Sequence, residues 1–69
     1  LRNPARDVLT FDENIDIKNV KIFSLLGQIM LELPHPKSNL DISKLPNGVY
    51  VVLIQTDQQV YKEKLIIEQ

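Results

Sequence analysis

Residues 49–67 read VYVVLIQTDQQVYKEKLII, and this stretch decides the fold class. It starts with a run of β-branched and aliphatic residues, passes through Asp57-Gln58, and returns as a second run in which apolar and charged residues alternate. Two such runs joined by a short polar link are typical of paired strands. We therefore predict antiparallel strands over 49–56 and 59–67, joined as a hairpin.

The remainder of the chain repeats this pattern in shorter pieces. Short strands are predicted over 8–11, 15–18, 20–25, 28–33 and 40–42, with alternation clear in some and a second apolar face in 20–25. No segment has helical periodicity over three turns, and the connections are too short for parallel crossovers. Gly27 predicts a tight turn with positive φ, and Asn47-Gly48 predicts another. About seven short strands with frequent turns predict an all-β fold, a small antiparallel β-sandwich.

The orientation of three strands needs separate consideration. Residues 49–56 are apolar on both faces, which fits either a central strand or a surface for a partner or second copy. In the last strand we expect Tyr61, Leu65 and Ile67 to point inward. Glu63 shares their face and should lie near an edge of the sheet. The alternative register turns Val60 and Ile66 inward. The segment 28–33 should place its branched residues on one face: Ile29, Leu31 and Leu33.

Length and composition limit the chain to one small domain. Its 69 residues include eight basic and nine acidic side chains, so the net charge is −1 and no clustered basic surface for nucleic acid is expected. The absence of cysteine excludes a disulfide framework. The longest apolar run, 49–54, is too short for a membrane-spanning helix, and we expect no insertion into a lipid bilayer. A domain this small is only marginally stable, so we expect residues 1–69 to be part of a larger protein.

No recognisable catalytic, metal or cofactor motif occurs. His35 is the only histidine and lies between two prolines, where a solvated loop residue is expected. The start of a calcium-loop pattern occurs at Asp12, Asn14 and Asp16. However, Ile17 occupies the position that requires glycine, and Phe23 occupies that of the bidentate glutamate. We therefore expect a non-catalytic domain without metal or cofactor.

Four motifs in a fixed order carry a resemblance to a known family. They are NPARDVLTF (3–11), IKNVKIFSLLGQIMLE (17–32), LDISKLPNGVYVVLIQTD (40–57) and KLII (64–67). Together they make the chain resemble, over nearly all of its length, the type A C-terminal sorting domain of the type IX (Por) secretion system of Bacteroidetes. The resemblance implies an Ig-like sandwich that is a single C-terminal sorting domain, residues 1–69, of a larger secreted protein.

In that family the domain is a secretion signal. Cargo reaches the periplasm by an N-terminal signal peptide, and the C-terminal domain directs it through the outer-membrane translocon. A sortase commonly removes the domain and attaches the cargo at the cell surface. The expected partners are therefore translocon and sortase components, and the expected location is the periplasm in transit, then the outer-membrane surface or the extracellular space.

The family's motif positions fall on Pro4, Gly27, Leu45, Gly48, Tyr50, Lys64 and Leu65. Both glycines and the tyrosine favour structural roles, in turns and in the core. Direct recognition is better assigned to Lys64, Leu65, Ile66 and Ile67, because the family's signal depends on its C-terminal end. Our hypothesis is that an exposed strand end there adds to the sheet of a partner.

The alternative function is an Ig-like adhesion or carbohydrate-binding module. Such modules often present exposed aromatic rings, and this chain has only Phe11, Phe23, Tyr50 and Tyr61. The strand that is apolar on both faces also leaves open a weak homodimer.

Overall fold

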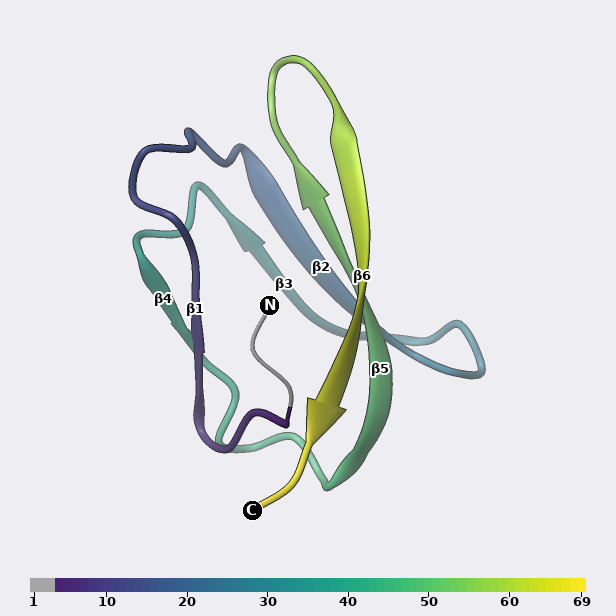
Figure 1. The fold of residues 1–69 in the computed structure, drawn as a ribbon. Helices are drawn as coiled ribbons and strands as arrows, with labels where there is room; N and C mark the ends of the chain where they lie inside the picture. Colours follow the sequence, from purple (N-terminus) through teal and green to yellow (C-terminus); the bar gives the residue numbers. More distant parts are fainter. Residues whose placement is uncertain (1–3) are drawn as a thin grey trace.

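The computed structural model describes residues 4–69 and contains strands and loops only (Figure 1). The six strands in that range are β1 (Val8–Thr10), β2 (Asn19–Ser24), β3 (Ile29–Pro34), β4 (Asn39–Asp41), β5 (Gly48–Gln55) and β6 (Val60–Ile67). One sheet has the order β3-β2-β5-β6, and β1 pairs with β4 in a second sheet. All these pairings are antiparallel. The predicted all-β antiparallel sandwich is confirmed, and it is consistent with an Ig-like arrangement.

The strand count in residues 4–69 is six, where the sequence predicts about seven. The difference lies in 15–18, which is a loop. The carbonyl of Asp12 accepts the N–H of Ile15 at 3.2 Å in a turn, and the N–H of Lys18 donates to the carbonyl of Gln55 at 2.7 Å. Ile15 lies at the end of this turn and is 42% exposed, whereas Ile17, two residues later, is buried.

The predicted hairpin of 49–56 and 59–67 forms the β5–β6 pair. Its register runs from Gly48 opposite Ile67 to Gln55 opposite Val60. Since β5 lies between β2 and β6, it is the central strand that one of the two interpretations required. Its alternate side chains from Tyr50 to Ile54 are buried, while Val51 and Leu53 are half-buried on the outer face.

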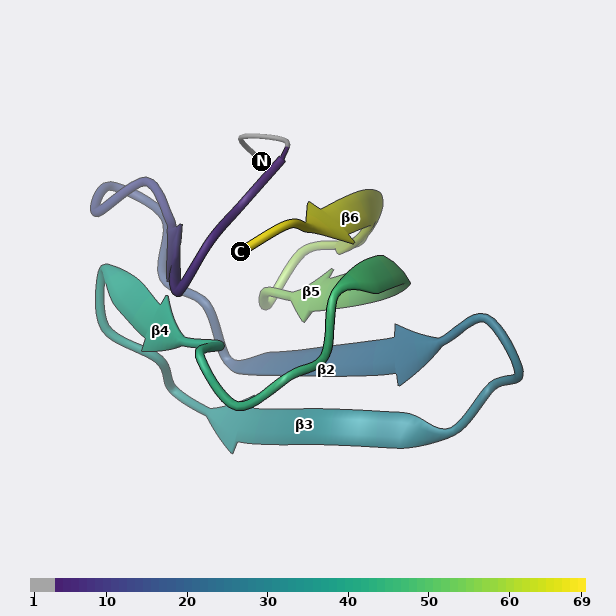
Figure 2. The ribbon, with the colours of Figure 1, turned by 90° about the horizontal axis from the view of Figure 1, so that it is seen from below.

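The core lies between the two sheets, which Figure 2 shows along their edges. Fourteen apolar residues in the range 4–69 are buried, and no polar or charged residue in that range is. They are Ala5, Leu9, Phe11, Ile17, Val20, Ile22, Leu40, Ile42, Leu45, Tyr50, Val52, Ile54, Leu65 and Ile67. No helix of the described residues could cross a membrane.

The β2–β3 hairpin departs from the simple alternation predicted for 28–33. The register shifts between Ile22 and Phe23, so that Leu31 lies opposite Ile22 but Ile29 lies opposite Phe23. Such a shift inserts one extra residue into a strand. As a result Met30 and Leu31 both pack against the core, while Ile29 is 54% exposed. The prediction that Ile29 shares the core face is therefore wrong, whereas Leu31 and Leu33 do pack there.

Candidate functional site

Most of the motif residues gather at one end of the sandwich, around the C-terminal half of β6. There Gly48 lies opposite Ile67, and Tyr50 lies opposite Leu65. The side chains of Leu65 and Ile67 are 0% and 1% exposed, and that of Tyr50 is also buried. Alternation in β6 thus points Tyr61, Leu65 and Ile67 toward the core, as predicted, and leaves Glu63 exposed near the sheet edge.

The N-terminal segment pairs with the end of β6. Ala5 forms a parallel bridge with Ile67. The N–H of Ala5 donates to the carbonyl of Ile66 at 2.7 Å, and the N–H of Glu68 donates to the carbonyl of Ala5 at 2.9 Å. Figure 1 shows the start of the coloured chain beside the end of β6. The end of β6 at Ile66 and Ile67 is therefore already paired with the N-terminal segment, and recognition of residues 64–67 by a partner stays a prediction. Leu65 and Ile67 contribute their side chains to the core, while Lys64 is exposed and Ile66 is half-buried.

Gln69 adds three hydrogen bonds at this end of the sandwich. The main-chain N–H of Gln69 donates to Oδ1 of Asn47 at 3.0 Å. Its side-chain Nε2 donates to the carbonyls of Arg6 and Ser43, each at 3.2 Å. Three separate segments thus meet at Gln69: the N-terminal segment, the residues after β4 and the turn before β5. Pro4, which precedes the bridge, is exposed.

Tyr50 anchors the turn that leads into β5. Its hydroxyl donates to the carbonyl of Pro46, four residues upstream, and its ring is buried. Gly48, at φ +157°, packs against this side chain. A Cβ added to Gly48 would lie 3.9 Å from a ring carbon and from the hydroxyl of Tyr50. Leu45 is buried just before the turn. A buried tyrosine that bonds back to the main chain is the corner found in many Ig-like sandwiches.

Tyr50→Phe is expected to lower the free energy of unfolding by about 1 kcal/mol, because one hydrogen bond to a carbonyl is lost while the ring stays in place. Urea denaturation followed by circular dichroism measures this loss. Tyr61→Phe is the matched control, since the Tyr61 hydroxyl accepts its hydrogen bond from the exposed side chain of Gln59. Equal losses in the two variants would contradict the anchoring role of Tyr50.

Gly27 lies far from this cluster, in the β2–β3 turn that projects from the sandwich in Figure 1. Its φ of +89° confirms the predicted positive value and favours glycine. No atom lies within 4 Å of a Cβ added there, so the requirement is conformational and not steric. Leu26 beside it is 92% exposed.

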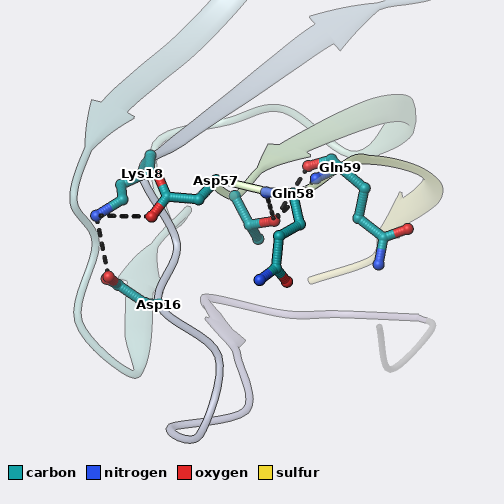
Figure 3. A network of polar contacts seen from close by, with 6 residues as sticks. Asp16, Lys18, Asp57, Gln58 and Gln59 are labelled. Atoms are coloured by element: carbon teal, nitrogen blue, oxygen red, sulfur yellow. Dashed lines mark hydrogen bonds and ion pairs between the residues drawn. The ribbon is translucent and has the colours of Figure 1, made fainter.

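A polar network holds the β5–β6 turn at the other end of the sheet (Figure 3). The Lys18 amine lies 3.0 Å from a carboxylate oxygen of Asp16 and 3.8 Å from one of Asp57. The hydrogen bond to Asp16, together with the charges of both aspartates, raises the pKa of Lys18. Within the turn, Thr56 Oγ1 accepts the N–H groups of Gln58 and Gln59, each at 3.2 Å. The start of β6 is thereby fixed in position.

The candidate chemical motifs have structural roles in this fold. Asp12 Oδ1 accepts the N–H of Asn14 at 2.9 Å, and no group of at least three metal-ligating side chains occurs in residues 4–69. His35 is exposed at φ +49°, and its N–H donates to the carbonyl of Lys18. In β4, hydrogen bonds from Ser43 lower the pKa of Asp41. None of these groups lines a catalytic arrangement in the described part of the chain.

The aromatic side chains do not form an exposed platform for sugars. Phe11 and Tyr50 are buried, and Phe23 and Tyr61 are half-buried. Phe23 lies on the outer face of the large sheet, where it lines a shallow hollow with Val51, Leu53 and Lys62. The outer face of β5 thus carries half-buried apolar side chains, as the interpretation of a central strand requires.

Comparison with known proteins agrees with the motifs. A family described as secretion system C-terminal sorting domain matches residues 3–68, nearly the whole chain. The chain is also 34% identical over 70 residues to the protein named ulvan lyase NLR42 of Nonlabens ulvanivorans. That match covers 94% of this chain but only 13% of the relative, so the chain spans a small part of that protein's length.

Proposed function

The chain belongs to the family of secretion system C-terminal sorting domains, and from this premise we propose that it carries a cargo protein out of the cell through the type IX translocon. The observation that carries this proposal is the family match over residues 3–68, which leaves almost no residue outside the sorting domain. In this proposal the domain is a signal, and any catalytic activity belongs to the cargo.

The finer steps of the proposal follow the family. The cargo crosses the periplasm with this domain attached, the translocon recognises the folded domain, and a sortase removes it while the cargo is attached at the cell surface. The relative's name is that of an enzyme, and the chain corresponds to 13% of it. This proportion suits a signal appended to a much larger catalytic protein.

A fusion to a fluorescent protein tests the proposal. Residues 1–69 are placed behind a flexible linker on a periplasm-targeted fluorescent protein, in a bacterium with a type IX system. We expect fluorescence at the cell surface or in the medium, and its retention in the periplasm of an isogenic strain without the translocon. The same protein without residues 1–69 should stay in the periplasm of both strains. Retention of the complete fusion, in cells that export their own cargo, would refute the proposed function.

A further inference from the structure

The edge of β6 presents main-chain groups away from the sheet. In an antiparallel pair, alternate residues bond to the neighbouring strand. The N–H of Thr56 donates to the carbonyl of Gln59, whereas the carbonyl of Ile66 accepts from Ala5 on the opposite side. This alternation directs the N–H and carbonyl of Lys62 away from β5, toward the edge. Among residues 4–69, Ala5 pairs with this edge through its bridge to Ile67, which lies at the opposite end of β6 from Val60.

A hollow opens beside the first half of β6, between its inner face and the end of β1. It has a volume of about 250 Å³. Its buried lining is apolar and comprises Phe11, Ile17 and Ile54, with Tyr61 half-buried beside them. The two charged residues that line it are Asp12 and Glu63, both exposed, and no basic residue does. The hollow is therefore apolar inside and acidic at its mouth.

We propose that the edge at Val60–Glu63 and this hollow together bind an extended segment of the export machinery, which adds as a strand to β6. The inference rests on the proposed function and names the surface that is recognised. Main-chain bonds to an added strand supply affinity, and a pocket beside the edge supplies selectivity. The side chain that suits this pocket has a long apolar stem and a cationic end, as lysine and arginine have.

The charges on β6 indicate which other side chains the partner segment would carry. Lys62 points to the outer face of the sheet and Glu63 to the inner face. A strand that alternates acidic and basic residues would complement both faces. A second copy of this chain would instead place its own lysines across from Lys62 and Lys64, because the same edge would be presented twice. Like charges directly opposite each other oppose pairing, so the favoured occupant is a different protein.

Two pairs of variants in the export fusion test this inference. Lys62→Pro removes the outward N–H without removing a bond to β5, and proline is tolerated at such edge positions. Lys62→Val keeps the N–H and is its matched control. Glu63→Arg reverses the charge at the mouth of the hollow, and Glu63→Gln is its matched control. Denaturation of each 69-residue variant verifies that it is folded.

We expect export to fall about tenfold for Lys62→Pro, as loss of one main-chain bond predicts. Glu63→Arg should lower export at least as much. Lys62→Val and Glu63→Gln each remove one charge but keep every main-chain bond, so they should lower export less, by about threefold. Normal export of folded Glu63→Arg and Lys62→Pro would overturn the inference and leave the proposed function standing. If the unmodified fusion is itself retained, the proposed function fails first.

Sedimentation of the purified chain tests the competing occupant. We expect a monomer across the concentration series. A dimer that Lys62→Pro dissociates would assign this edge to a second copy of the chain and would overturn the proposal of a different partner.

Discussion

Leu65→Ala is expected to lower the free energy of unfolding by about 2–5 kcal/mol. Leu65 is 0% exposed and lies opposite Tyr50 in the β5–β6 pair, so its removal leaves a cavity in the middle of the core. A 69-residue domain has a total stability of roughly 3–10 kcal/mol. The loss therefore takes a large fraction of that stability, and a substantial population of the variant should be unfolded at 37 °C. Urea denaturation followed by circular dichroism measures the change.

The chain contains a matched control for this substitution. Leu26→Ala removes the same atoms from a side chain that is 92% exposed in the β2–β3 turn, and it should change stability by no more than about 0.5 kcal/mol. In the export fusion, Leu26→Ala should behave as the unmodified domain. If the two leucine substitutions destabilise the chain equally, Leu65 does not belong to the core as described.

The features predictable from sequence are those that local pattern determines. The β5–β6 hairpin follows from two β-branched runs joined by a polar link. The inward face of its second strand follows from the alternation of Tyr61 and Leu65 with Lys62 and Lys64. Gly27 has the positive φ that its turn requires. In each case the residues that carry the signal are neighbours in the chain, so the geometry follows from them directly.

Features that depend on distant segments were not predictable in the same way. Ile29 and Leu31 have the spacing of one strand face, yet the extra residue in β3 turns Ile29 outward. The register shift that inserts this residue is determined by the pairing with β2. Ile15 and Ile17 have the spacing of a strand, but Ile15 ends a turn in which its N–H donates to the carbonyl of Asp12. A period of two is therefore not sufficient for a strand.

The candidate site shows the same division. The sequence pointed to residues 64–67, and Leu65 and Ile67 are indeed important positions, but as part of the core. The pairing of Ala5 with the end of β6 is made by main-chain atoms, which any residue supplies, and so it leaves no signature in the sequence. A family motif at the C-terminus can thus contribute to the fold, and the surface that we propose for a partner lies elsewhere on the same strand.

A chain that ends at Tyr61 is expected not to fold. It lacks Leu65 and Ile67, and it leaves the inner side chains of β5 without the strand that covers their edge. It also lacks the bridge to Ala5 that holds the N-terminal segment. We expect no cooperative unfolding transition, binding of a hydrophobic dye and loss of export of the fusion. Circular dichroism, dye fluorescence and the export assay measure these three properties.

A chain that ends at Ile67 separates the fold from the terminal residues. It keeps all of β6 and loses only the bonds made by Glu68 and Gln69, which join them to Ala5, Asn47, Arg6 and Ser43. Because these bonds are largely exposed, we expect a folded chain destabilised by about 1–3 kcal/mol. A cooperative transition of equal midpoint in the chains ending at Tyr61 and at Ile67 would contradict the role of β6 in the core. Export of the chain ending at Ile67, with retention of an unfolded chain ending at Tyr61, would mean that export requires residues 62–67 and the sandwich that they complete.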